Sequence, residues 1–314
     1  MADRIFVITG PTATGKTRLS VELAKSLDGE IVSADSMQIY RGMDIGTAKV
    51  TPAEMQGIPH YMIDIASPSE DYSVSRYVSE ADAAVQDILS HGKLPIIAGG
   101  TNLYIDSLIA GLDFAETAQD DALRNELNAR YDDIGGQAML DKLREFDPER
   151  AEKLHPADKR RIIRAIEVYS LTGKTITQHD DETKQRPKRY DAVKLALNFA
   201  DRGVLYERIN ARVDKMISDG LFDEVRQLLN RGLSPDSTAM QAIGYKEPAA
   251  YFRGEMSMDE AAEQIKLSSR RYAKRQLTWL RRDASVAWYE WPSEPDFENA
   301  LRFAINLYNA ELKV

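Results

Sequence analysis

Eight residues near the N-terminus have the types and the spacing of a phosphate-binding loop. The segment GPTATGKT fits the pattern G-x-x-x-x-G-K-[S/T]. An apolar run, RIFVITG, leads into it, and Leu19, Leu23 and Leu27 follow at helical spacing, which is the strand-loop-helix context that the pattern needs. The predicted phosphate-binding residues are Gly10, Pro11, Thr12, Ala13, Thr14, Gly15, Lys16 and Thr17.

The chemistry of this loop comes from its backbone and from two side chains. Glycines let backbone N–H groups turn inward and, together with the N-terminus of the following helix, bind phosphate oxygens. Lys16 adds a positive charge, and the hydroxyl of Thr17 can hold Mg²⁺. We therefore expect a phosphorylated ligand at this loop.

A second feature usual in nucleotide-hydrolysing P-loop proteins is missing. Those proteins have another strand that ends in an Asp, which helps to hold the metal. The best candidate here, residues 94–98, ends in GGTNLY and has no carboxylate. The sequence therefore does not require the phosphorylated ligand to be ATP.

A carboxylate does follow the predicted strand at residues 30–33, in the segment ADSMQIYRGMDIGTAK. Asp35 stands where that strand ends, so it could act on a ligand at the same edge of the sheet. A solvated loop acid is the ordinary interpretation, because Asp is mostly exposed in folded proteins. The position alone does not decide between the two.

Composition limits the class of protein. With 314 residues, of which 43% are hydrophobic, the chain can form a sizeable core in one or two domains. The absence of cysteine excludes disulfides, thiolate metal sites and a thiol nucleophile, and four scattered histidines do not favour a zinc site. The apolar run in MADRIFVITG is too short for a signal peptide, and no stretch approaches the roughly 20 apolar residues that span a bilayer. We expect a cytoplasmic protein without a membrane partner.

Charge is unevenly distributed along the chain. The net charge is −9, which argues against a protein that coats nucleic acid with its whole surface. Residues 142–189, however, hold thirteen Lys/Arg and nine Asp/Glu, and residues 264–282 hold seven Lys/Arg and no acid. Basic segments in an acidic chain indicate a localised anionic partner.

The hydrophobic periodicity predicts an α/β fold. Apolar runs without polar alternation alternate with helical patterns in the first hundred residues, which is typical of a parallel sheet covered on both faces. Helices are expected near 16–27 and 73–91, and near 202–218, 222–231 and 259–282. The apolar run AVKLALNF, at 192–199, resumes the strand pattern.

Between these parts, residues 114–189 change to a helical character. Patterns near 121–131, 136–146, 148–154 and 159–171 predict helices, and an open polar stretch, TQHDDETKQRPKRY, follows them. We interpret 114–189 as a helical domain inserted into a sheet domain made of 1–113 and 190–314.

Together these segments resemble the bacterial tRNA dimethylallyltransferases, also called tRNA isopentenyltransferases. The matching segments run in order from residue 10 to 283 and are GPTATGKT, SADSMQIYRGMDIGTAK, IPHYMIDI, AGGTNLY, LHPADKRRIIRAIEVY, GKT, ERINARVDKMISDGLFDEV, AIGYKE and KRQLTWLRRD. The resemblance implies a P-loop NTPase-like core with an inserted helical domain that binds the anticodon stem-loop of tRNA. It also implies transfer of a dimethylallyl group from dimethylallyl diphosphate to the exocyclic amine of the adenosine 3′ of the anticodon, with Mg²⁺ as cofactor.

The resemblance assigns catalytic roles to Asp35, Thr101 and Arg212. Asp35 matches the family's general base, Arg212 an arginine that reaches the diphosphate, and Thr101 a residue that contacts the target nucleotide. Taken alone, Arg212 could be an exposed helical arginine paired with Glu207 or Asp214, and Thr101 could be a helix N-cap.

The resemblance also implies a tRNA-binding set. In the segment KRRIIRAIE, Arg160 and Arg164 lie one helical turn apart, while Ile162, Ile163, Ile166 and Tyr169 form the expected buried stripe. A solvated basic helix face would look similar. The predicted tRNA-binding residues are Asp35, Ser36, Met37, Gln38, Thr101, Arg124, Lys159, Arg160, Arg161, Arg164, Gln241, Gly244, Tyr245, Lys246 and Arg281. We expect Trp279 to be a core residue rather than a platform on which a base stacks.

Two other functions fit parts of the pattern. A P-loop kinase of small molecules would use Asp35 as the base for a hydroxyl acceptor, and a non-catalytic RNA-binding protein would form no covalent product. The basic insertion disfavours the first, and a carboxylate facing the phosphate loop disfavours the second. The sequence leaves open which tRNAs are modified and what the oligomeric state is, for which a monomer is our expectation.

Overall fold

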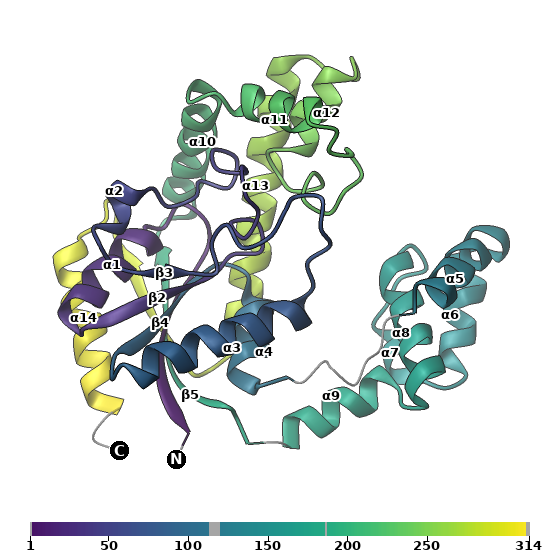
Figure 1. The fold of residues 1–314 in the computed structure, drawn as a ribbon, viewed down its shortest axis with the longest axis horizontal. Helices are drawn as coiled ribbons and strands as arrows, with labels where there is room; N and C mark the ends of the chain where they lie inside the picture. The colour runs from purple at the N-terminus through teal and green to yellow at the C-terminus, as the bar shows by residue number, and fades with distance from the viewer. Residues whose placement is uncertain (1, 113–119, 186, 312–314) are drawn as a thin grey trace. The chain divides into compact units, whose positions relative to one another are not determined.

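The computed structural model describes residues 2–112, 120–185 and 187–311, and the chain divides into two compact units (Figure 1). The core unit consists of Met1–Ile109 and Arg189–Val314, and the insertion unit of Ala110–Lys188. The expected insertion, 114–189, has nearly the same bounds.

A six-stranded sheet forms the centre of the core unit. Its strands are β1 (Asp3–Thr9), β2 (Gly29–Ala34), β3 (His60–Tyr61), β4 (Leu94–Gly99), β5 (Tyr190–Phe199) and β6 (Val286–Trp291). They lie in the order β3-β2-β4-β1-β5-β6, and every neighbouring pair is parallel. The carboxyl ends of β1, β2 and β4 therefore lie at one edge, which is where open α/β sheets bind ligands.

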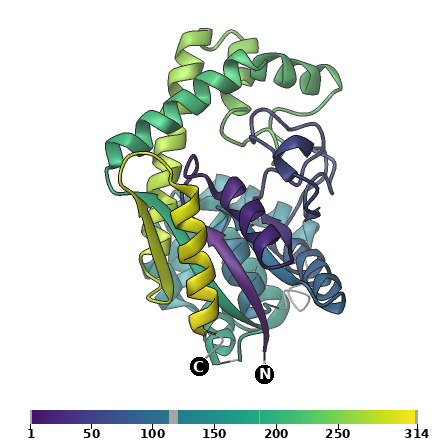
Figure 2. The ribbon, with the colours of Figure 1, turned by 90° about the vertical axis from the view of Figure 1, so that its left-hand side faces the viewer.

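Helices precede and follow the insertion. They are α1 (Lys16–Ser26), α2 (Pro52–Met55), α3 (Val74–Ser90), α4 (Asn102–Ala110), α10 (Arg202–Ser218), α11 (Leu221–Asn230), α12 (Lys246–Phe252), α13 (Met258–Leu280) and α14 (Phe297–Glu311). Helix α14 contacts α1 and β5, and Figure 2 shows it running beside the strands. Among the described residues, no helix combines the length and the apolar character that crossing a membrane requires.

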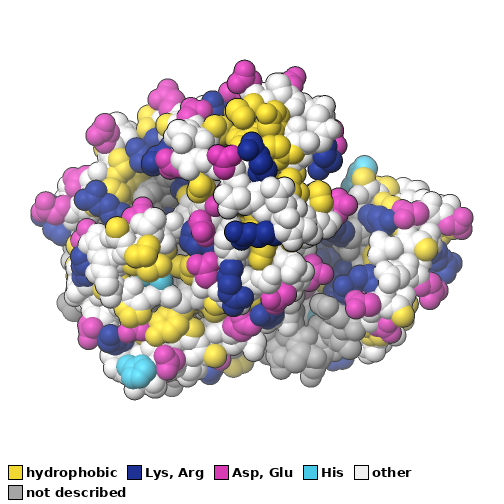
Figure 3. Space-filling model, turned by 45° about the horizontal axis from the view of Figure 1, so that its top comes forward, with side chains coloured by type: hydrophobic (Ala, Val, Ile, Leu, Met, Phe, Trp, Pro, Cys, Tyr) yellow, Lys and Arg dark blue, Asp and Glu magenta, His cyan; other side chains and the backbone are white. Residues whose placement is uncertain are grey.

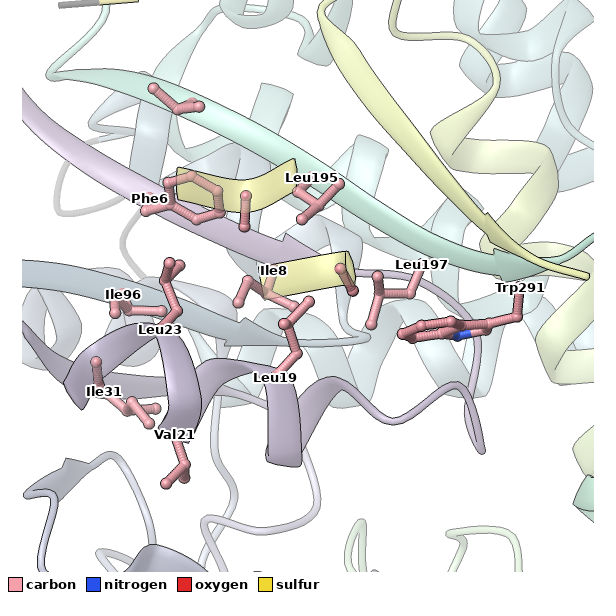
Figure 4. Close-up of a cluster of buried hydrophobic side chains, with 14 of the residues drawn as sticks. Phe6, Ile8, Leu19, Val21, Leu23, Ile31, Ile96, Leu195, Leu197 and Trp291 are labelled. Atoms are coloured by element: carbon pink, nitrogen blue, oxygen red, sulfur yellow. The ribbon is translucent and has the colours of Figure 1, made fainter. Parts of the chain in front are cut away.

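The core lies on both faces of the sheet, which explains why the strands lack polar alternation. On one face, Phe6 and Ile8 pack with Leu19 and Leu23 of α1, and Trp291 closes one end of the cluster (Figure 4). Successive side chains of a strand point to opposite faces, so Ile5 and Val7 lie on the other face, and they are fully buried too. Figure 3 shows a surface on which Lys and Arg side chains lie among Asp and Glu side chains.

The insertion unit is helical and has a hydrophobic core of its own. Its helices are α5 (Asp121–Ile134), α6 (Gly136–Arg144), α7 (Pro148–Glu152), α8 (Lys159–Thr172) and α9 (Ile176–Gln185). Leu127, Met139, Leu143 and Ile162 are among the side chains buried together there. The first four helices lie where the periodicity predicts them.

Helix α9 is a correction, because its segment was expected to be an open polar stretch. Thr175 and Gln178 exchange hydrogen bonds: the Gln178 N–H donates to the Thr175 hydroxyl (3.1 Å), and the Thr175 N–H donates to Gln178 Oε1 (2.9 Å). This reciprocal pair is a capping box, which starts a helix without an apolar stripe. The carboxylate of Asp147 then accepts bonds from the Thr177 N–H (3.2 Å) and hydroxyl (2.5 Å) and so ties α9 to α7.

Replacing Asp147 with Ala should loosen this junction. The carboxylate is buried and also accepts from the Arg150 N–H (3.2 Å), so its loss leaves several donors without a partner, at a cost of about 1–3 kcal/mol. We expect amide hydrogen exchange to accelerate in α7 and α9 and to stay unchanged in β1 and β5. Asp141→Ala, at an exposed carboxylate of α6, is the matched control and should change exchange little. Unchanged protection of α9 in Asp147→Ala would contradict this role.

Candidate active site

The phosphate loop connects β1 to α1 and depends on glycine at two positions. Gly10 has φ 132°, and a Cβ there would lie 2.3 Å from the carbonyl oxygen of Leu197. Gly15 has φ 87°, and a Cβ there would lie 2.8 Å from the ring of Phe297. A side chain at either position would strain the backbone and clash, so the loop conformation needs the glycines of the sequence pattern.

A cavity of about 490 Å³ opens at the carboxyl ends of the strands, lined by the core unit. It brings together most of the predicted site residues of this unit. Those that line it are Thr12, Ala13, Thr14, Gly15, Lys16, Thr17, Asp35, Ser36, Met37, Gln38, Arg212, Gln241, Gly244 and Lys246. Gly10 and Pro11, the first residues of the loop, do not line the cavity, and their carbonyl oxygens accept hydrogen bonds from Lys16 Nζ at 3.0 and 2.7 Å.

Lys16 and Arg212 face this cavity without a carboxylate ion pair among the described residues, as does the exposed Arg275. Burial and the nearby charge of Arg212 lower the pKa of Lys16 to about 7, against a smaller opposing effect of Asp35. Burial also lowers the pKa of Arg212, and Asp35 again opposes the shift. Asp214, one of the partners considered for Arg212, pairs with Lys266 instead (2.8 Å). The cavity is therefore ready to accept an anion that neutralises both groups.

Asp35 follows β2 and lines the same cavity. Its Oδ1 accepts a hydrogen bond from the Met37 N–H (2.9 Å), which fixes the side chain over its own turn. In the described part of the chain, Oδ2 has no hydrogen-bond donor, so this oxygen can accept a proton or a hydrogen bond from a ligand. Asp35 is thus a held carboxylate and not a freely solvated loop acid.

Thr101 holds the loop that carries Asp35. Its hydroxyl accepts from the Ser36 N–H (3.0 Å), and its own N–H donates to the Ala34 carbonyl (3.0 Å). Thr101 precedes α4 and accepts from the Tyr104 and Ile105 N–H groups through its carbonyl (2.9 and 3.2 Å), whereas in the described part of the chain its hydroxyl accepts no bond from the helix backbone. Gly100, the preceding residue, lines the cavity, whereas Thr101 stands behind it.

Two expectations in the core unit are wrong. Tyr245, predicted to face RNA, is fully buried, and its hydroxyl donates to Glu224 (2.6 Å). Glu224 also accepts from the backbone N–H groups of Asp44 (2.9 Å) and Ile45 (2.8 Å), so Tyr245 supports the loop after Asp35 from within the core. Trp279, expected in the core, is 42% exposed.

In the insertion unit, the predicted cations fall into two groups. Arg160 and Arg161 are exposed and have no ion pair among the described residues. Arg124 and Arg164 instead pair with the buried carboxylate of Glu167, both at 2.9 Å.

Further predicted residues of the insertion unit lie only partly as expected. Lys159 pairs with Asp132 (2.5 Å). Ile162, Ile163 and Ile166 are buried as expected, but Tyr169 is 37% exposed and stacks on Phe146 (4.1 Å between ring centroids). Arg281, the last of the predicted tRNA-binding cations, is exposed at the end of α13 in the core unit.

Gln276 of α13 also belongs to the site, although no sequence motif predicts it. It is buried, accepts from the Thr12 N–H (3.3 Å) through Oε1 and donates to the Gly100 carbonyl (2.9 Å) through Nε2. It thereby links the phosphate loop to the end of β4. The signal was a glutamine on the apolar face of a predicted helix, beside Ala273 and Leu277.

Apolar side chains complete the wall of the cavity. Among them are Ile31, Val50, Ile63, Ile209, Val213, Met216, Ile243 and Ile265. The arrangement therefore suits a ligand with an anionic head and a small apolar part, next to a carboxylate that can accept a proton.

A parallel sheet with a phosphate loop after its central strand, and with a carboxylate after the second strand, defines a P-loop NTPase-like α/β protein. Residues 38–283 match the family described as IPP transferase, and the chain belongs to this family. It is 49% identical over 290 residues to a tRNA dimethylallyltransferase of Thermoanaerobacter sp. (strain X514), which covers 92% of each chain.

Solved structures of similar proteins support the same family. The full-length tRNA isopentenylpyrophosphate transferase of Bacillus halodurans superposes with a TM-score of 0.74, is 42% identical and covers 99% of this chain and 98% of its own. A eukaryotic dimethylallyltransferase acting on tRNA gives a TM-score of 0.86 at 28% identity, over 99% of this chain and 80% of that one. The fold and the family expected from the sequence are thus confirmed.

The pKa of Lys16 makes anion binding pH-dependent. A bound anion favours the charged amine of Lys16 and raises its pKa. Binding of an alkyl diphosphate should therefore be accompanied by uptake of nearly one proton by Lys16 at pH 8 and of little at pH 6. The affinity for the diphosphate should fall about tenfold per pH unit above pH 7.5. Calorimetry in two buffers of different ionisation enthalpy measures the uptake. Lys16→Arg should abolish it, because a guanidinium stays protonated; uptake that persists in this variant would contradict the assignment to Lys16.

Proposed function

We propose that this protein is a tRNA dimethylallyltransferase, which moves a dimethylallyl group from dimethylallyl diphosphate to the exocyclic amine of the adenosine 3′ of the anticodon. The observation that carries the proposal is that two unneutralised cations, Lys16 and Arg212, share a cavity with Asp35 and with apolar side chains. Membership of the IPP transferase family supports the same reaction.

Asp35 is proposed as the general base. The amine nitrogen forms a bond to the allylic carbon, the bond between that carbon and the diphosphate oxygen breaks, and the carboxylate accepts the proton that the nitrogen loses. An exocyclic adenine amine is a poor nucleophile, so a positioned base is useful, by about 10²- to 10⁴-fold. The hydrogen bond from the Met37 N–H holds one oxygen and leaves the other for this task.

The leaving diphosphate is proposed to bind the phosphate loop. Negative charge grows on its oxygen as the allylic bond breaks, and Lys16, Arg212 and the backbone N–H groups of the loop can stabilise it. Thr17 is exposed and lines the cavity, and its hydroxyl is an oxygen ligand of the kind that Mg²⁺ takes together with substrate phosphates. Bound there, Mg²⁺ would neutralise charge on the leaving group.

Recognition of tRNA is proposed to use both units. The target base must leave its stack to reach the cavity, and Ser36, Met37, Gln38, Gln241 and Lys246 line the space that it would enter. Exposed arginines of α8 would bind phosphates of the anticodon stem-loop. We expect the protein to act in the cytoplasm as a monomer.

Asp35→Ala should lower the rate of prenyl transfer at least about a hundredfold and change tRNA affinity no more than a few-fold, because it removes a proton acceptor and not a binding charge. Single-turnover transfer of labelled dimethylallyl to unmodified tRNA measures the rate, without ATP. A near-normal rate would remove Asp35 from the mechanism, and strict ATP dependence in the purified reaction would favour the kinase.

The exposed arginines of α8 give a separate prediction. Replacing Arg160 and Arg161 with Gln should raise the KM for tRNA and flatten the decline of tRNA binding with salt by about one to two units of slope, because fewer counterions are released. Affinity for dimethylallyl diphosphate should hardly change.

Arg144 and Lys153 provide the matched control. Both are exposed cations of the insertion unit with carboxylate neighbours, so replacing them with Gln removes the same charge from paired positions. Arg164 is left unchanged, since its pairing with buried Glu167 would make its loss structural. Equal salt slopes in the two double variants would mean that Arg160 and Arg161 form only a solvated surface.

A further inference from the structure

An exposed tryptophan on α13 is held in one orientation by a network of charged groups. The indole N–H of Trp279 donates to Asp106 Oδ2 (2.7 Å) on α4. Asp106 in turn lies 3.3 Å from Lys194 Nζ, a largely buried amine of β5 that also pairs with Asp283 (2.7 Å). The ring nevertheless remains 42% exposed. The network therefore fixes the edge of the indole and leaves part of the ring free for contact with a partner.

Trp279 lies next to the cavity along the same helix. Tyr272, Arg275 and Gln276 line the cavity, and Trp279 follows Gln276 by three residues, on the same side of α13. The two positions are separated by about 4.5 Å along the helix axis. Asn102, the first residue of α4, donates to the Gln276 carbonyl (3.3 Å), so α4 and α13 are in contact at this point.

The segment of the chain that carries the ring is rich in cations. Five side chains from 271 to 282 are exposed and have no carboxylate partner in the described part of the chain: Arg271, Lys274, Arg275, Arg281 and Arg282. The nearest acids are already engaged, Asp106 by Trp279 and Lys194, and Asp283 by Lys194 and Ser285. An exposed aromatic ring among unpaired cations is the combination that binds single-stranded nucleic acid.

A lipid surface fits this site less well. Membrane-binding helices present a continuous apolar face. Arg275, one turn before Trp279 on α13, is charged, and so is Arg282, which follows the end of the helix.

We propose that Trp279 stacks on an unpaired nucleotide of the RNA substrate adjacent to the one whose base enters the cavity. This inference rests on the proposed function, since it takes tRNA as the substrate. Stacking at this distance from the cavity holds the RNA strand beside its mouth and so favours the flipped position of the target nucleotide. Trp279 is then a positioning residue that acts through the RNA and does not touch the reacting atoms.

The test compares two substitutions that differ in what they keep. Trp279→Phe keeps an aromatic ring and loses the N–H, whereas Trp279→Leu loses the ring. With an unmodified anticodon stem-loop RNA, Trp279→Leu should weaken RNA binding about 5- to 100-fold, and Trp279→Phe less than about threefold. Affinity for dimethylallyl diphosphate without RNA should stay unchanged in both. Phe303→Leu, at an exposed aromatic residue of α14, is the control and should behave as the unaltered protein.

Abasic substitutions at each loop nucleotide identify the partner base. If one base stacks on Trp279, its removal should weaken binding by the unaltered protein and have little further effect on Trp279→Leu, a non-additivity confined to one position next to the target. Equal losses in the Phe and Leu variants, or additive effects at every position, would overturn the proposal. Thermal melts show which variants are folded, and Trp279→Met replaces the Leu variant if that one is not.

A direct measurement of RNA binding distinguishes failure of the stacking inference from failure of the proposed function. If the unaltered protein prenylates the RNA while Trp279→Leu binds it normally, the stacking inference alone fails. If no prenyl transfer occurs with any tRNA, the proposed function fails, whatever the binding data show.

Discussion

The unneutralised charge of Lys16 and Arg212 is the constraint on which the site depends. Burial raises the cost of both charges and so lowers the pKa of Lys16 and of Arg212, and the nearby charge of Arg212 lowers the pKa of Lys16 further. Asp35 compensates only in part. The fold keeps these groups together through the glycines of the loop, the start of α1 and the position of α10. A bound diphosphate would neutralise their charge.

Asp35 can serve such a ligand only if its loop is held, and remote segments supply the restraints. Thr101 binds Ser36 from the end of β4, and Gln276 links that same strand end to the phosphate loop. On the other side, Glu224 accepts backbone N–H groups of residues 44–46 and is itself held by Tyr245. These contacts join parts of the chain that are up to 264 residues apart. The geometry of the site is thus a property of the whole core unit.

Local sequence patterns predict the main strands, the long helices and the phosphate loop. The surroundings of single side chains depend on partners that are remote in the sequence. The phosphate loop, the buried strands and the long helices follow from glycine spacing and hydrophobic periodicity, which act within a few residues. The hydrogen-bond partner of Tyr245, Glu224, lies 21 residues away, and that of Trp279, Asp106, lies 173 residues away, so no local pattern predicts the surroundings of either ring. Helix α9 was missed because a capping box and Asp147, rather than an apolar stripe, define it. The two-residue strand β3 is too short for periodicity to distinguish it from a loop, and the edge strand β6 is buried only at its two end residues, unlike the central strands.

The insertion unit separates two kinds of positive charge. Arg124 and Arg164 share the buried carboxylate of Glu167, which leaves one net charge on a pair of guanidinium groups fixed in place. Arg160 and Arg161 are exposed and unpaired in the described residues, so they keep their rotamer freedom. Fixed groups can set the register of a phosphate backbone, whereas mobile ones add attraction that salt screens within about 8–10 Å. A net acidic chain can in this way bind a polyanion at one place without attracting it everywhere.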